Sequence, residues 1–128
     1  MTAARDCLYV CETCLRDRQP APGEATLGRR LGDAIELALD SLPPAARPIF
    51  RRVACLNACL SPCSIALRAR GKVGLRLSRL APADAPAVAA LAELYCRSAD
   101  GDPSPALWPA ALHVKLSART PAPRPLPS

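Results

Sequence analysis

The chain has 128 residues, a net charge of +6 and an aromatic content of only 3%. This length suits one domain with a single core, and no apolar run approaches the roughly 18 residues that a membrane-spanning helix needs. The positive charges are spread along the chain with few aromatic residues among them, which disfavours a nucleic-acid surface, because such surfaces cluster charge and stack bases on rings.

Two strands joined by a helix are expected in the first half of the chain. Residues 7–10 form a short apolar strand. Apolar residues recur with the 3.6-residue period over positions 27–42, which predicts a helix that Thr26 can cap. A pair of prolines then ends this helix. Residues 49–54 form the second strand. A helical crossover makes this strand parallel to the first, so the carboxyl ends of both lie on one edge of the sheet.

A hairpin and a second helix follow. Residues 64–68 and 73–77 alternate apolar and polar side chains around a turn near Gly71, which is the pattern of a β-hairpin. Asp84 is placed to cap the next helix. The buried stripe of that helix is expected to consist of Val88, Leu91, Ala92 and Tyr95.

The last part of the chain is read as a short helical turn, an edge strand and a tail. The turn covers residues 106–112, and the strand is the alternation of Leu112, Val114 and Leu116. Four prolines make residues 120–128 a disordered tail, which leaves residues 1–119 as the single domain. The order β-α-β-β-β-α predicts an α/β (α+β) fold with a mixed sheet and helices packed on it.

Five of the seven cysteines follow the two parallel strands in the sequence. We therefore expect them at the edge of the sheet where both strands end. Cys11 and Cys14 follow the first strand, while Cys55, Cys59 and Cys63 follow the second. Thiolates are soft anionic donors, and a closed metal or iron–sulfur site usually takes four. We expect one pair from each loop, Cys11 with Cys14 and Cys55 with Cys59, to share such a site. Cys63 reads equally as a ligand and as a small buried residue that begins the next strand.

The other candidate residues favour structural roles. Cys7 is expected in the core, Cys96 is expected to be structural or incidental, and His113, the only histidine, is expected to be satisfied or solvent-facing. No set of residues suits hydrolytic catalysis. Four arginines lie near the cysteine loops in the sequence: Arg51, Arg52, Arg68 and Arg70. Each of them, taken alone, is expected at an exposed strand position. Together they could offset the negative charge of the thiolates or contact an acidic partner.

The cysteine loops carry a resemblance to a known family. The sequence resembles a bacterial family of uncharacterised, predicted metal-binding proteins that is related to the thioredoxin-like [2Fe-2S] ferredoxins. The segments that carry the resemblance are Leu8-Tyr-Val-Cys-Glu-Thr-Cys14, Cys55-Leu-Asn-Ala-Cys59-Leu-Ser-Pro-Cys63 with Ser64-Ile-Ala-Leu67, and Gly71-Lys72. Weaker similarities lie at residues 80–84 and at Leu94-Tyr95.

The resemblance implies a thioredoxin-like fold with a [2Fe-2S] cluster at the end of the sheet. The ligand positions of the ferredoxins match Cys11, Cys14, Cys55 and Cys59. Two departures stand out: the ferredoxins usually space the first pair more widely than C-x2-C, and they tend to have proline where this chain has Cys63. Val73 also replaces an aromatic residue that the family usually has after Gly-Lys.

Three functions follow as hypotheses. The first is a [2Fe-2S] electron-transfer or sensing module that is not itself an enzyme and that exchanges electrons with a redox partner protein, with a homodimer as an allowed state. The second is a zinc-binding structural or metal-delivery protein, because zinc accepts the same four thiolates. The third is a thiol–disulfide oxidoreductase using Cys11 and Cys14. Residues 1–6 lack the features of a signal peptide, so we expect a cytoplasmic protein with neither nucleic-acid nor membrane partners.

Overall fold

The computed structural model describes residues 6–11, 27–53 and 63–121. The strands within these ranges are β1 (Cys7–Cys11), β2 (Ile49–Val53), β3 (Ile65–Arg68), β4 (Gly74–Leu77) and β5 (Leu116–Thr120). The α-helices are α1 (Leu27–Leu39) and α2 (Ala85–Arg97), and the short 3-10 helices are Pro44–Ala46, Pro82–Asp84, Pro105–Leu107 and Ala110–Leu112.

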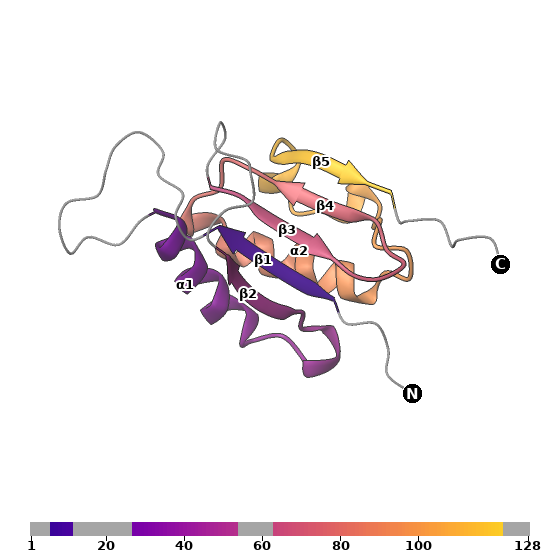
Figure 1. Cartoon of the computed structure of the whole chain (residues 1–128), viewed down its shortest axis with the longest axis horizontal. Coiled ribbons are helices and arrows are strands. Elements are labelled where there is room, and N and C mark those ends of the chain that lie inside the picture. Colours follow the sequence, from indigo (N-terminus) through magenta and orange to yellow (C-terminus); the bar gives the residue numbers. More distant parts are fainter. Residues whose placement is uncertain (1–5, 12–26, 54–62, 122–128) are drawn as a thin grey trace.

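The strands form one mixed sheet in the order β2-β1-β3-β4-β5 (Figure 1). β1 pairs with β2 in parallel, and the pairs β1–β3, β3–β4 and β4–β5 are antiparallel. The predicted mixed α/β sheet and the parallel pairing of its first two strands are therefore confirmed. The parallel register, Cys7 opposite Ile49 through Cys11 opposite Val53, brings the carboxyl ends of both strands to the same edge.

Helix α1 forms because apolar side chains return to one side at the 3.6-residue period. Leu31, Ile35 and Leu39 are buried on that side, and the opposite side is exposed and charged. The helix is shorter than the predicted range 27–42. The chain after Leu39 turns more tightly than an α-helix, since the Leu42 N–H donates to the Leu39 carbonyl at 3.0 Å, only three residues back.

The hairpin and α2 follow the sequence pattern closely. Gly71 lies in the turn with φ of +76°, a conformation that glycine adopts without strain, and the predicted stripe of α2 is buried. Asp84 is the N-cap residue of α2, as predicted, but its side chain makes no capping hydrogen bond to the helix. Its carboxylate instead accepts the backbone N–H of Ala81 at 2.9 Å and thereby closes the 3-10 turn that precedes the helix.

The C-terminal strand lies further along the chain than the alternating pattern predicted. Leu112 ends a 3-10 helix and is buried, Val114 is 73% exposed, and the strand β5 begins only at Leu116. β5 pairs with β4 as far as Thr120 opposite Gly74, so the first residue of the predicted tail belongs to the sheet. Residues 122–128 lie outside the described ranges, and the disordered tail and the domain limit at residue 119 stay predictions.

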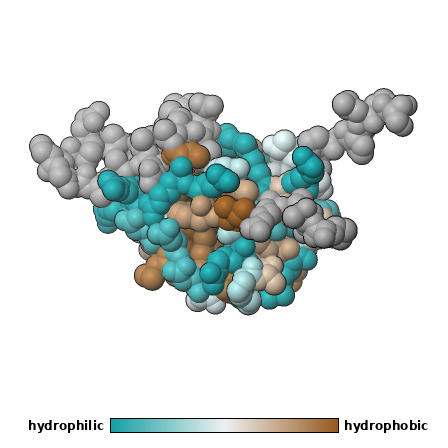
Figure 2. Space-filling model, turned by 60° about the horizontal axis from the view of Figure 1, so that its bottom comes forward, coloured by the Kyte–Doolittle hydropathy of each residue, from teal (hydrophilic) through white to brown (hydrophobic). Residues whose placement is uncertain are grey.

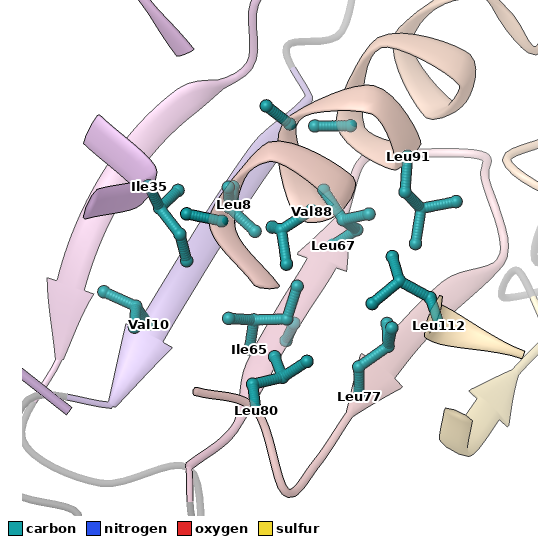
Figure 3. Close-up of a cluster of buried hydrophobic side chains, with 14 of the residues drawn as sticks. Leu8, Val10, Ile35, Ile65, Leu67, Leu77, Leu80, Val88, Leu91 and Leu112 are labelled. Atoms are coloured by element: carbon teal, nitrogen blue, oxygen red, sulfur yellow. The ribbon is translucent and has the colours of Figure 1, made fainter. Parts of the chain in front are cut away.

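Both helices pack on one face of the sheet and bury a single apolar core against it (Figure 1, Figure 3). Alternate residues of β1, β3 and β4 point toward the helices, where they meet the apolar stripes of α1 and α2 (Figure 3). The labelled core residues in Figure 3 are Leu8, Val10, Ile35, Ile65, Leu67, Leu77, Leu80, Val88, Leu91 and Leu112. The opposite face of the sheet carries no described helix, and we call it the open face.

The described surface has few large apolar side chains. Within the described residues, the exposed ones are Leu37, Leu107 and Val114, and they lie in three separate segments. The side of the molecule in Figure 2 shows hydrophilic residues surrounding smaller hydrophobic areas. None of the described helices has the length and apolar character that crossing a membrane requires.

Candidate metal centre

Three chain segments meet at the edge of the sheet where β1 ends. Cys11 is the last residue of β1 and lies opposite Val53, the last residue of β2. The backbone N–H of Cys11 donates to the Ser64 carbonyl at 3.2 Å, which ties the same point to the start of β3. We call this place, defined by Cys11, Val53 and residues 63–64, the cysteine edge.

Two of the candidate ligands are described, and both lie at the cysteine edge. Cys11 is 3% exposed and Cys63 is not exposed at all. The Cys63 carbonyl accepts the backbone N–H of Leu80 at 3.0 Å, which fixes the chain just before β3. Both cysteines also belong to the apolar core cluster. Their surroundings therefore exclude water while holding two soft donor atoms on neighbouring segments.

The three remaining candidate ligands, Cys14, Cys55 and Cys59, lie outside the described residues. In the sequence Cys14 follows Cys11 by three positions and Cys55 follows Val53 by two, so the segments that carry them continue from the cysteine edge. Within the described residues alone, no three His, Cys, Asp or Glu side chains gather as a metal site would require.

A chain of three serine hydroxyls runs from the cysteine edge across the sheet. The Oγ atoms of Ser64 and Ser78 are 3.4 Å apart, Ser78 Oγ donates to Ser117 Oγ at 2.9 Å, and Ser117 Oγ donates to the Arg76 carbonyl at 3.1 Å. Ser64 and Ser78 are the buried polar residues of the described chain. Sequence reasoning missed this chain, although a serine directly after Cys63 was a signal that could have been followed.

The other two cysteines lie elsewhere. Cys7 begins β1, at the end of the strand away from Cys11, and is partly exposed, so its predicted core position is wrong. Its side chain alternates with that of Leu8 and therefore belongs to the open face. In α2, burial raises the pKa of the Cys96 thiol to about 12, and the nearby Asp6 carboxylate adds to the effect. The Cys96 thiol is therefore held in its protonated form, and its predicted structural or incidental role stays a prediction.

The single histidine is exposed, as expected. Its Nε2 atom lies 3.1 Å from the Trp108 carbonyl, and Trp108 is in turn held by a hydrogen bond from its ring nitrogen to the Pro103 carbonyl at 3.0 Å. His113 therefore supports the irregular segment before β5 and has a local structural partner.

The arginines near the cysteine loops separate onto two faces. Arg52 lies on the helix side, where its guanidinium pairs with Asp33 at 2.9 Å and Glu36 at 3.4 Å on α1. Arg51, on the neighbouring position of β2, therefore belongs to the open face, as does Arg68. Both are exposed, which agrees with the prediction made for each singly.

Comparison with solved structures identifies the fold as thioredoxin-like. A crystal structure at 1.5 Å of the wild-type thioredoxin-like [2Fe-2S] ferredoxin from Aquifex aeolicus is 16% identical, with a TM-score of 0.52 over 77% of this chain and 91% of that one. Another structure of a thioredoxin-like [2Fe-2S] ferredoxin from Aquifex aeolicus is 18% identical, with a TM-score of 0.48 over 67% of this chain and 77% of that one.

A search of curated proteins finds no match to the chain. A family model does match it, over residues 8–122, which include every described helix and strand apart from Cys7, the first residue of β1, and all five clustered cysteines. The chain therefore belongs to the family described as "protein of unknown function (DUF1636)".

Proposed function

We propose that the protein is a [2Fe-2S] ferredoxin-like electron-transfer or sensing module. Cys11, Cys14, Cys55 and Cys59 would hold the cluster at the cysteine edge. A bound cluster would supply one-electron exchange, with its potential set by hydrogen bonds to sulfur and by burial. On this proposal the protein is not an enzyme by itself, and it exchanges electrons with a partner protein.

One observation carries the proposal: the buried Cys11 stands where β1 and β2 both end. The sequence continues from these two strand ends into the segments that contain Cys14, Cys55 and Cys59. The donor set fits the group, because thiolates are the usual ligands of [2Fe-2S] clusters and Cys11 lies in a site that excludes water. The chain also shares its fold with a protein named as a thioredoxin-like [2Fe-2S] ferredoxin, which supports the proposal.

Zinc is the second candidate, and the burial of Cys63 favours it. Cys11 and Cys63 lie on neighbouring segments with almost no exposure, so two thiolates in this region already suit a small closed tetrahedral site. A thiol–disulfide oxidoreductase is less well supported. Its attacking thiolate is normally stabilised at a helix N-terminus, and α1 begins only at Leu27, well after Cys14.

The test is an anaerobic visible absorption spectrum, with iron, acid-labile sulfide and zinc assayed on the same purified sample. Absorption between roughly 400 and 600 nm, with about two iron and two sulfide per chain, is the expected result. A colourless protein with about one zinc per chain would refute electron transfer and establish the zinc site. A sample that holds neither metal after anaerobic reconstitution would leave the dithiol function, which an insulin-reduction assay on a Cys14→Ser variant would then test.

A further inference from the structure

The open face of the sheet carries positive charge and no described negative charge. The strand register places Arg51, Tyr9, Ala66 and Arg76 side by side in one row across β2, β1, β3 and β4. Arg68, two residues along β3 from Ala66, lies over the ring of Tyr9 at 5.9 Å. None of the described strand positions that point to this face is Asp or Glu.

The described acidic residues that form ion pairs near β1 and β2 belong to the other side of the sheet. Asp33 and Glu36 on α1 pair with Arg52, and Asp6 pairs with Lys72 at 2.7 Å close to α2. In the part of the chain that the structure describes, Arg51, Arg68 and Arg76 form no ion pair with a carboxylate. Among the described residues, three guanidinium groups thus lie on one face of the sheet without a carboxylate partner.

We infer that the open face, defined by Tyr9, Arg51, Arg68 and Arg76, is a docking surface for an acidic protein. Neighbouring strands lie about 4.8 Å apart, so Arg51 and Arg76 are separated by about 14 Å at the backbone. This spacing suits several separate carboxylates on a folded partner. The planar guanidinium pairs with a carboxylate through two hydrogen bonds and is only weakly hydrated, which favours its use at an interface.

Two other occupants fit the surface less well. Single-stranded nucleic acid is held by successive bases stacked on several rings, whereas this face offers Tyr9, whose ring is already covered by Arg68. A second copy of the chain that docked through the same face would bring arginines against arginines, and such like-charge contacts are unfavourable.

The surface lies beside the candidate metal centre. Tyr9 and Cys11 are two residues apart on β1, which is about 7 Å along the strand. A partner on the open face would therefore approach the cysteine edge. The use of this surface in electron transfer rests on the proposed function, but the binding of an acidic partner does not require a metal.

The test compares two triple variants that remove the same charge. The open-face variant and the control variant each lower the net charge from +6 by three. The control positions lie in α1, after β4 and at the end of α2, and are exposed. The open-face variant is Arg51→Gln, Arg68→Gln and Arg76→Gln, and the control variant is Arg30→Gln, Arg79→Gln and Arg97→Gln.

The probe is a fluorescein-labelled glutamate-rich peptide, titrated with the full chain in its metal-free and reconstituted forms. We expect the open-face variant to bind the peptide about tenfold more weakly than the unaltered chain, and the control variant to stay within about twofold. High salt should weaken binding by the unaltered chain toward the level of the open-face variant. Because the peptide is measured on metal-free protein too, its binding is judged independently of whether a cluster forms.

Four outcomes would overturn the inference. Equal losses in both variants would mean that only the overall charge matters. Tighter binding of an oligothymidylate than of the peptide, lost in Tyr9→Ala, would assign the face to nucleic acid. Cosedimentation with anionic vesicles without peptide binding would assign it to a membrane surface. A dimer of the unaltered chain that the open-face variant abolishes would make the occupant a second copy.

Discussion

The two buried cysteines at the cysteine edge allow the ligand set to be separated from the packing of the core. Cys11→Ala and Cys63→Ala each remove one sulfur atom from a side chain that is at most 3% exposed. In the proposed function, Cys11 is a ligand and Cys63 is a packing residue. We therefore predict that Cys11→Ala abolishes the cluster, while Cys63→Ala keeps it.

The two substitutions should cost the metal-free protein similar amounts of stability. A buried sulfur is about the size of a methylene group, whose burial contributes about 0.8 kcal/mol. The cavity left behind adds roughly 24 cal/mol per Å³, which brings the expected loss to about 1.5 kcal/mol for each variant. With a urea slope of about 2 kcal/mol per molar, each unfolding midpoint should fall by about 0.75 M.

The measurement pairs urea unfolding of metal-free protein with iron and sulfide assays after reconstitution. Matched midpoints with cluster in Cys63→Ala alone would support the assignment. Loss of the cluster in Cys63→Ala, at the same metal-free stability as Cys11→Ala, would refute it and make Cys63 a ligand. Retention of the cluster in Cys11→Ala would refute the proposed role of the end of β1 altogether.

Three further predictions concern the described core and helices. Gly101→Ala should destabilise by at least 3 kcal/mol in thermal unfolding, because its Cβ would lie 2.6 Å from the Cβ of Lys72 at a φ of +71°. Gly71 has a φ of +76°, but a Cβ added there would have no atom within 4 Å, so Gly71→Ala should lower the free energy of unfolding by only about 1 kcal/mol. Equal losses of stability in the two variants would contradict the clash at Gly101. Tyr95→Phe removes the 2.7 Å hydrogen bond to the Val73 carbonyl and should cost about 1–2 kcal/mol, measured by urea unfolding. Cys96 should be alkylated far more slowly at pH 8 in folded than in unfolded protein, since its pKa rises from 9.0 to about 12. Its contribution to stability is complete below pH 9 and is lost as the pH rises toward 12, because only the unfolded chain then releases the proton.

The parallel strands and their shared edge could be predicted because the signals are local. β1 and β2 are short apolar runs, and the helical period between them requires a crossover, which sets their relative direction. The stripe of α2 was likewise visible from its spacing, since helix faces depend on neighbours three and four residues away. Nothing more than the sequence was needed to bring Cys11 and Val53 to the same edge.

The errors arose where contacts between distant segments decide the structure. The alternation of Leu112, Val114 and Leu116 resembles a strand, yet Leu112 is buried in the core and ends a 3-10 helix. The hydroxyl chain from Ser64 to Ser117 joins residues from three separate segments, and its members meet only through the strand register. The periodic pattern of apolar residues within one segment contains no information about contacts between distant segments, so these hydrogen bonds could not be predicted from it.

The order of the strands explains why the cysteine edge and the open face can act together. β1 lies inside the sheet between β2 and β3, so the backbone of Cys11 is held on both sides. The side chains of β1 then alternate between the helix-covered core and the open face. Leu8 and Val10 stabilise the fold, while Tyr9 lies on the open face beside Arg68 and the buried Cys11 ends the same strand. A partner that neutralises the arginines of the open face would bring negative charge close to the cysteine edge, where the buried surroundings of Cys11 screen that charge only weakly. Docking of an acidic protein is therefore expected to change the chemistry of the cysteine edge as well as its accessibility.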